Sequence, residues 1–521
     1  MSSDDVPQFS QHKPSSTSFA DVFKTLGVGR PKSHSPVSLQ ESSSDSLSHT
    51  DSRGTNRRAH GSESMHRGSV VSSSSDTPSG LDFETSLHNL SQRQNLAQAI
   101  EEADSLSKGL SWFSSDQSMV LWEAAEYLLH HESSPDAQQS GARLLEAIAA
   151  RQDLSPSARR LVFESIASPT EPEVIAARVQ SLISLSDHGR KLDFASSSIL
   201  HIISSWIVPF YETIASARAK AKKGKVVKPH GPSHDEAVFA DLFQFVVDLI
   251  TLQRKQPTQE EIETLLTEIF TTCRRTSVAA DIKNSLAVFD AVIMYADVPD
   301  ISFPTLLEVL CSIHASVKPL SGPTSRAVRS LAKSRRQAEM VNTLHDFLRD
   351  SCAVEQSRNL NVLRGTLYVF SDFVRAYGQD GMPQLPFDHL MESLQVIAQK
   401  DDSRVDADML DLCLNILEGD YVRVALERDW TAFVNLIILC SRRLVDESAP
   451  SPTSTTSPQG KPTYDETKSY ILANLIRIAS ALESQWEQLN RDQKHHAVRF
   501  LMKIHQHVEP PQAELIIHSM R

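Results

Sequence analysis

The sequence predicts an all-α fold, an elongated α-solenoid of HEAT- or armadillo-like helical repeats preceded by a disordered serine-rich tail. Three observations support this prediction. Apolar residues recur every three or four positions through most of the 521 residues, and aromatic residues make up only 6%, which is low for a chain of strands. The expected helix starts are spaced so that a pair of helices occupies roughly 40 residues. Because one pair cannot bury its apolar faces alone, neighbouring pairs are expected to stack, with separate helical bundles as the alternative.

The first 80 residues differ in composition from the rest of the chain. They contain 23 serines, and their eight basic and eight acidic residues cancel. Large apolar residues are too few to offset the entropy of ordering, so residues 1–80 are expected to be disordered. One apolar cluster in this tail, Phe19, Val22, Phe23 and Leu26, falls on one helical face. It is interpreted either as an incidental helical turn or as a docking helix for a partner.

Residues 81–447 are predicted to form the solenoid, and capping residues mark several of its helices. Ser-Pro pairs at 134–135 and 155–156 place a capping side chain before a proline at the first helical position. Residues 258–261 form a capping box, followed by the apolar stripe of residues 262–270. Asp116 and Ser277 are further cap candidates. The expected helix starts lie near residues 116, 135, 156, 172, 195, 235, 258, 277, 303, 324, 355, 386, 403, 430 and 465.

Two polar segments interrupt this rhythm and are expected to be mobile and exposed. Residues 218–234 are a basic run that ends in proline and glycine, and residues 448–464 are a Pro/Ser loop. Residues 465–521 are predicted to continue the solenoid as C-terminal helices. The basic run is interpreted either as a solvated helix end or as a contact for acidic lipid headgroups or a phosphorylated partner.

The composition argues against several classes of function. A net charge of -13 repels a phosphate backbone, so no nucleic-acid partner is expected. Only 17 glycines are present, and no phosphate-binding, nucleophile-elbow or zinc-protease motif occurs. The sequence therefore predicts a binding module that is not an enzyme and has no cofactor. No signal peptide or stretch long enough to span a bilayer is found, which together with reduced thiols indicates a cytoplasmic protein.

Neither the cysteines nor the histidines are interpreted as metal ligands. Five cysteines lie among apolar neighbours without a CxxC pair, as expected of reduced, buried thiols. The histidines at 130–131, 495–496 and 505–507 lack the further ligands that zinc requires, so they are interpreted as surface histidines.

Arginines at or near breaks between helices are the candidate partner-binding residues. Arg190 follows a His-Gly pair at an expected helix end, Arg274 and Arg275 precede a break, and Arg364 lies within an apolar helix. Each arginine either bonds carbonyls at helix ends, which would join adjacent repeats, or presents its guanidinium to a partner's carboxylates.

These same segments resemble the N-terminal region of the tuberin family, the large subunits of the tuberous sclerosis complex. The resemblance runs from about residue 19 to about residue 445 and is densest at 273–299. The matching segments are residues 23–31, 121–124, 186–190, 273–276, 281–282, 285–286, 288, 290–292 and 363–365. Residues 32–80 and the two polar segments depart from the animal pattern, which is typical of a fungal-type homologue.

The resemblance implies a function for the chain. In that family the N-terminal α-solenoid binds the coiled coil of hamartin. The assembled complex stimulates GTP hydrolysis by the GTPase Rheb, upstream of TOR signalling. The GTPase-activating domain lies at the family's far C-terminus and has no counterpart here. The chain thus looks like a non-catalytic scaffold that is cytoplasmic, with peripheral attachment to the lysosome or vacuole membrane through the complex, and that meets Rheb only through the missing domain.

Two other functions fit the residues. A transport or vesicle adaptor built on the same solenoid would bind peptides or acidic lipids through the basic run. A regulatory platform would rest on the tail, where residues 57–62 and 67–69 resemble basophilic kinase sites. Each added phosphate would contribute about -1.5 to -2 charges. In so serine-rich a segment, chance matches are expected.

Overall fold

The computed structural model describes residues 82–130, 133–169, 171–195, 198–223, 232–252, 256–353, 360–379, 381–399, 403–446 and 464–505. The expected tail and the Pro/Ser loop at 448–463 therefore lie outside the described residues. Contacts divide the chain into two units, Met1–Ser86 and Leu87–Arg521.

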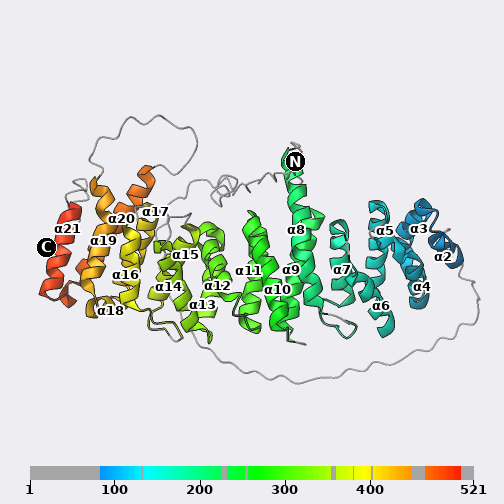
Figure 1. Cartoon of the computed structure of the whole chain (residues 1–521), viewed down its shortest axis with the longest axis horizontal. Helices are drawn as coiled ribbons and strands as arrows, with labels where there is room; N and C mark the ends of the chain where they lie inside the picture. Colours follow the sequence, from blue (N-terminus) through cyan, green and yellow to red (C-terminus); the bar gives the residue numbers. More distant parts are fainter. Residues whose placement is uncertain are drawn as a thin grey trace, which may run out of the picture. The chain divides into compact units, whose positions relative to one another are not determined.

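The second unit is an α-solenoid of two helical layers, and within each layer the successive helices pack side by side (Figure 1). This confirms the predicted fold class. The first layer consists of α8 (Ile199–Lys223), α10 (Gln259–Arg275), α12 (Phe303–Ser316), α15 (Leu360–Arg375), α17 (Ser403–Glu418) and α20 (Tyr464–Ser484). The second layer consists of α3 (Leu96–Gly109), α5 (Pro135–Ala149), α7 (Ile175–Leu185), α9 (His234–Thr251), α11 (Ala279–Tyr295), α13 (Ser321–Ala332), α14 (Gln337–Ala353), α16 (Phe387–Ala398), α19 (Trp430–Asp446) and α21 (Arg491–His505).

Most repeats are helical pairs, but two contain a third helix. Both α13 and α14 separate α12 from α15, and the short α18 (Val422–Glu427) precedes α19. Two more α-helices, α4 (Ser115–Ala125) and α6 (Pro156–Ala167), and the 3-10 helix Glu126–Leu129 belong to the N-terminal part of the array. The helix α2 (Phe83–Ser91) crosses the boundary between the two units. HEAT-like pairs and armadillo-like triplets thus occur in one chain.

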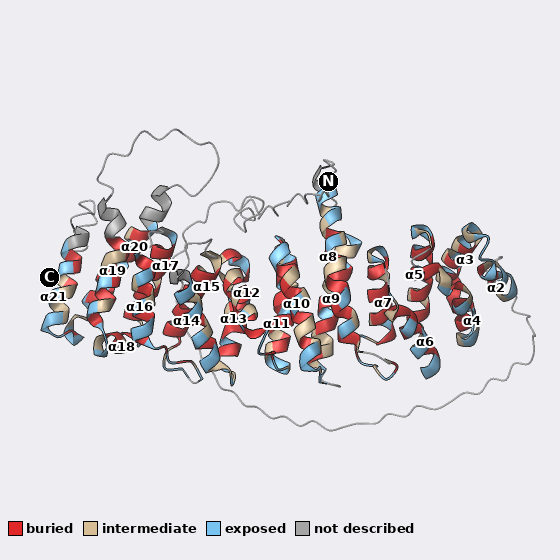
Figure 2. Ribbon diagram, viewed as in Figure 1, coloured by how far each residue is buried: buried red, intermediate tan, exposed pale blue. Residues whose placement is uncertain are grey.

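Buried side chains line the faces where the layers meet, as the colouring of Figure 2 shows. The expected stripe of α10 is buried, with Ile262, Leu265 and Ile269 each at most 1% exposed. Stacking of such stripes stabilises the folded state by about 25 cal/mol for each Å² of apolar surface that it removes from water. Each helix is therefore stabilised mainly by its neighbours.

Local start signals explain where the helices begin. Ser134, Ser155 and Thr258 cap α5, α6 and α10, and Thr258 completes the predicted capping box with Glu261. Two predicted caps were wrong. Ser114 with Gln117 caps α4, so Asp116 lies in its first turn, and α11 begins after Val278 without a side-chain cap. 

The first part of the basic run is helical. Residues 218–223 form the last turns of α8, so the expected loop boundary at 218 was wrong. The physical reason is that Arg218 is held by Glu236 and Asp281, which extends the helix beyond its apolar stripe.

Four cysteines have described surroundings. Cys273, Cys311, Cys413 and Cys440 are buried in α10, α12, α17 and α19 and carry free thiols, as the sequence predicts. Burial raises the pKa of the Cys273 and Cys311 thiols to about 12. Within the described part of the chain, no helix is long and apolar enough to cross a membrane, and no cluster of side chains is able to hold a metal ion.

Candidate partner-binding site

Arg274 and Arg275 end α10 and reach in opposite directions along the first layer. Nη2 of Arg274 lies 3.3 Å from Oε2 of Glu308 on α12, and Arg275 pairs with Glu212 on α8. Both arginine side chains are about half exposed (56% and 51%). Ion pairs at this exposure contribute little stability, roughly 0–1 kcal/mol. A partner's carboxylate would therefore compete for either guanidinium at small cost.

The break that follows these two arginines is rigid. Arg218 on α8 forms a bidentate pair with Asp281 on α11, at 2.6 and 3.1 Å, and Nε donates to Glu236 at 2.6 Å. The Thr276 hydroxyl donates to Asp281 at 2.8 Å, and Asp281 is almost fully buried. Burial lowers the pKa of Arg218, but its bonds to the two carboxylates outweigh burial and raise it overall. The network fixes the ends of α8, α9, α10 and α11 relative to one another.

Arg364 is held inside the array. Its Nε and Nη2 atoms donate to the Asp408 carboxylate of α17 at 2.5 and 3.2 Å, and Nη2 also donates to the Tyr368 hydroxyl at 2.8 Å. Tyr368 in turn donates to Asp408 at 3.0 Å. The Asp408 side chain is only 7% exposed and that of Arg364 25%. This guanidinium is therefore bound between α15 and α17 and is not free for a partner.

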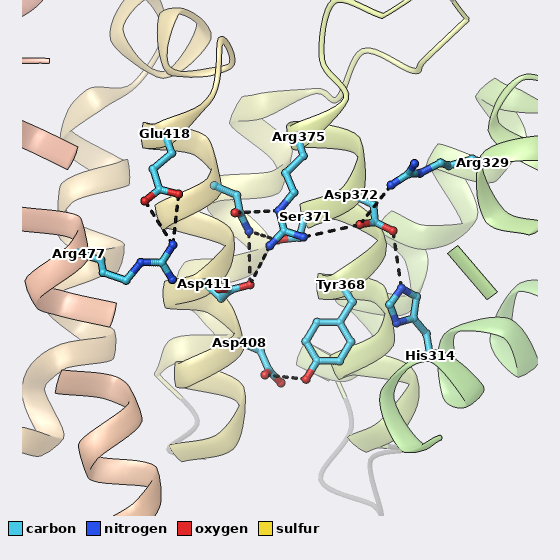
Figure 3. A network of polar contacts seen from close by, with 11 residues as sticks. His314, Arg329, Tyr368, Ser371, Asp372, Arg375, Asp408, Asp411, Glu418 and Arg477 are labelled. Carbon is cyan, nitrogen blue, oxygen red and sulfur yellow. Dashed lines mark hydrogen bonds and ion pairs between the residues drawn. The ribbon is translucent and has the colours of Figure 1, made fainter. Parts of the chain in front are cut away.

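A second polar network continues along the same layer (Figure 3). Asp372 on α15 accepts from Ser325 and lies 3.7 Å from Nε2 of His314 on α12 and 4.0 Å from Nη2 of Arg329 on α13. Burial favours a raised pKa for Asp372, but His314 and Ser325 hold it below its ordinary value.

The network reaches α20 through Arg375 and its neighbours. Arg375 donates to Asn415 at 2.9 Å and lies 3.7 Å from Asp411, both on α17. Arg477 on α20 lies 3.4 Å from Glu418 on α17. Polar bonds thus join successive helices of this layer from α12 to α20.

Arg190 lies in an unusual turn after α7. Asp187, His188 and Gly189 all have positive φ, at 49°, 53° and 80°. The Ser186 hydroxyl accepts from the Gly189 N–H at 3.1 Å, and Gly189 packs on Leu249. Left-handed backbone costs a residue with a Cβ about 1–2 kcal/mol, so Asp187 and His188 are held in this conformation by surrounding contacts. The expected His-Gly cap is thus displaced, since α7 ends at Leu185 with Ser186 as its cap.

The four predicted arginines lie on three elements. No hydrogen bond or ion pair in the described ranges joins any two of their side chains. Arg190 is exposed and has no side-chain partner there, whereas Arg274, Arg275 and Arg364 all pair with carboxylates of neighbouring helices. These three bridge repeats through carboxylates, so the expected bonds to helix-end carbonyls are not what they form.

Sequence reasoning missed the arginine that does bond such carbonyls. Arg178 on α7 is completely buried, and its Nη1 donates to the carbonyl oxygens of Ser165, Ile166 and Ser168 at 3.1, 2.9 and 2.6 Å. These carbonyls end α6, whose dipole places negative charge there. Burial lowers the pKa of Arg178 to about 10. The sequence does contain an indication of this role, because Arg178 is the one charged residue in the otherwise uncharged helix α7.

Three comparisons place this geometry among known proteins. A family model described as "Domain of unknown function (DUF3384)" matches residues 96–521. An uncharacterized protein of Schizosaccharomyces pombe, C18B11.11, is 20% identical over 298 residues, which are 56% of this chain and 22% of the relative. The chain therefore spans about a fifth of that relative's length.

A solved structure titled "Structure of the TSC2 N-terminus" superposes with a TM-score of 0.65 at 21% sequence identity, covering 81% of this chain and 98% of that one. The match confirms the resemblance to the tuberin N-terminus that the sequence suggested. In the residues described, the chain consists of this helical domain, and no catalytic domain is evident among them. Since the family model covers most of the sequence, the chain belongs to the DUF3384 family, and its described helices share the fold of the TSC2 N-terminus.

Proposed function

We propose that the chain is a non-catalytic scaffold, the N-terminal assembly domain of a tuberin-like GTPase-activator subunit. In this role it binds the coiled coil of a hamartin-type partner and assembles a complex that restrains Rheb and TOR signalling. The proposal is supported chiefly by the match to almost the whole TSC2 N-terminal structure. It also implies a cytoplasmic location, with attachment to the lysosome or vacuole membrane through the assembled complex.

The end of α10 offers a chemical basis for this binding. An amphipathic helical pair buries apolar residues in the partner surface and pairs its charged rim with arginines. Arg274 and Arg275 hold exposed carboxylates that a partner can replace, and Arg190 is exposed beside α7. Arg364 has a different role in this proposal, because Asp408 and Tyr368 already occupy its donors. It positions α15 against α17.

The test is a binding measurement between the 521-residue chain and the coiled coil of the hamartin-type protein from the same organism. The double variant Arg274→Ala/Arg275→Ala is expected to weaken binding at least tenfold while its circular dichroism stays unchanged. The matched control is Arg160→Ala/Arg423→Ala, which removes two exposed arginines elsewhere. Equal affinities of the two variants would reject the α10 assignment. Absence of binding by the unaltered chain would reject the scaffold function itself.

Liposome binding separates the adaptor alternative from this proposal. In the adaptor alternative, the basic run contacts acidic lipids. Its Arg218, however, is already neutralised by Glu236 and Asp281. Under the scaffold proposal, replacing Lys220 with Gln leaves coiled-coil binding unchanged, and co-sedimentation with phosphatidylserine vesicles is absent with or without that change.

A further inference from the structure

A second basic segment, in addition to the basic run at 218–234, lies in the middle of a protein that is acidic as a whole. Residues 309–338 contain six lysines and arginines and no aspartate or glutamate, against a net charge of -13 for the chain. The six are Lys318, Arg326, Arg329, Lys333, Arg335 and Arg336. Most of them belong to α13 and the turn that follows it. This segment therefore adds a local positive potential to a chain that is acidic overall.

Three of these cations form a stripe along α13. Arg326, Arg329 and Lys333 follow one another at intervals of three and four residues, which places them on one helical face over about 10 Å. All three are exposed. Arg329 approaches Asp372 only to 4.0 Å. Arg326 and Lys333 have no ion pair in the part of the chain that the structure describes. Their charges are available to another molecule.

A cavity of about 700 Å³ adjoins the end of this stripe. It lies between residues 256–259, the end of α11 and the turn from α13 to α14, and Ser334, which lines it, directly follows Lys333 of the stripe. Met294 and Tyr295 line it and remain 57% and 45% exposed. Arg335 stands at its edge, paired with Asp297 at 2.7 Å. Exposed apolar residues beside unpaired charges are typical of a protein-binding surface.

We propose that the α13 stripe and this cavity form one docking surface for an acidic amphipathic helix of a partner protein. Carboxylates spaced three and four residues apart on that helix pair with Arg326, Arg329 and Lys333, and an apolar side chain next to them enters the cavity beside Tyr295. The inference rests on the proposed scaffold function and names the surface and partner chemistry it uses. Charge complementarity supports it, since a helix presents carboxylates at the same spacing.

The dimensions of the surface favour a helix over a membrane. The stripe is one helix wide, so a single partner helix meets all of its charges. An anionic bilayer is an extended plane that would also face the acidic remainder of a chain with net charge -13. Long-range repulsion thus opposes the bilayer, whereas a helix lies within a Debye length of the stripe alone.

The decisive experiment measures the affinity of the 521-residue chain for the hamartin-type coiled coil at several salt concentrations. The variant Arg326→Glu/Arg329→Glu/Lys333→Glu is expected to bind at least tenfold more weakly and with less dependence on salt. The control, Arg160→Glu/Arg423→Glu/Arg428→Glu, changes net charge equally at exposed sites elsewhere and is expected to stay within twofold of the unaltered chain. In a second variant Arg326→Glu/Lys333→Glu, the Arg329 contact with Asp372 remains, which separates binding from folding.

The cavity is tested separately with Met294→Ser/Tyr295→Ser, which is expected to weaken binding at least fivefold without altering its salt dependence. Unchanged affinity of the α13 variants, or an equal loss in the control, overturns the docking surface and leaves the scaffold function standing. Loss of phosphatidylserine-vesicle binding in the α13 variants, with coiled-coil affinity intact, assigns the stripe to a membrane and also overturns it. No binding by the unaltered chain overturns the scaffold function first.

Discussion

Gly365 on α15 faces the backbone carbonyl of Cys311 on α12, and a Cβ atom at residue 365 would lie 1.9 Å from that oxygen. The two helices therefore approach more closely here than any other residue would allow. Beside this contact, Thr366 donates to the Cys311 sulfur at 3.8 Å. Gly365 thus sets the spacing between α12 and α15. These two helices are separated in the chain by two helices, α13 and α14, instead of one.

Replacing Gly365 with alanine is expected to lower the free energy of unfolding by more than about 3 kcal/mol, because the obstacle is backbone and cannot rotate away. Urea denaturation followed by circular dichroism measures the change. The matched control is Gly322→Ala in α13, where nothing lies within 4 Å of the added atom. Helix propensity favours this change and the following Pro323 opposes it, so its net effect is expected to stay within about 1 kcal/mol. Similar losses for both variants would contradict the close approach.

Asp281→Asn tests the network at the start of α11. The change removes the charge that holds the partly buried Arg218, and the expected loss of stability is about 2 kcal/mol or more. Asp297→Asn provides the control, because its ion pair with Arg335 is exposed on both sides and is expected to contribute under about 0.5 kcal/mol. Equal denaturation midpoints for the two variants would show that the buried network contributes nothing.

The left-handed turn after α7 predicts opposite effects at adjacent residues. His188→Gly is expected to stabilise the chain by up to about 1 kcal/mol, since it removes a Cβ at φ 53° from an exposed position. Gly189→Ala is expected to destabilise it by at least about 1 kcal/mol, because φ is 80° and the new Cβ would lie 3.3 Å from Leu249. Thermal unfolding of the two variants gives the signs, and a reversed order would refute the strain at His188.

His345 predicts a loss of stability in mild acid. Burial against Phe370, with a smaller contribution from His389, lowers the pKa of His345 below its ordinary 6.5. The unfolded chain therefore takes up a proton as pH falls through 6.5 while the folded chain resists it, so stability decreases below that pH.

His345→Gln is expected to flatten the fall in unfolding free energy between pH 7 and pH 5 by up to about 1.4 kcal/mol for each pH unit that separates the folded and unfolded pKa values. His201→Gln, at an exposed histidine, is expected to leave the pH profile as it was. Parallel profiles for the His345 variant and the unaltered chain would mean that this ring titrates alike in both states.

Helix identity could be predicted from sequence because it depends on local signals. The Ser-Pro starts of α5 and α6 and the capping box at Thr258 involve residues within one turn of each other, and all are observed. The helix α14 was missed. The turn before it, at residues 334–336, contains neither glycine nor proline, so nothing in the sequence marked a new start between 324 and 355.

Side-chain partners could not be predicted, because they join residues far apart in the chain. Arg364 was singled out for its charge in an apolar helix, but its partner Asp408 lies 44 residues away. The importance of Gly365 depends on the position of Cys311, which only the packing of α12 on α15 determines. Arg178 likewise needed the end of α6 to give it a role.

The buried thiols of Cys273, Cys311, Cys413 and Cys440 are distributed over four helices of the array. A thiol reagent reaches each of them only when its own helix detaches from its neighbours, since burial also suppresses the reactive thiolate. These four thiols are therefore probes of local unfolding. The labelling rate at each one reports how often its helix opens while the rest of the array stays native.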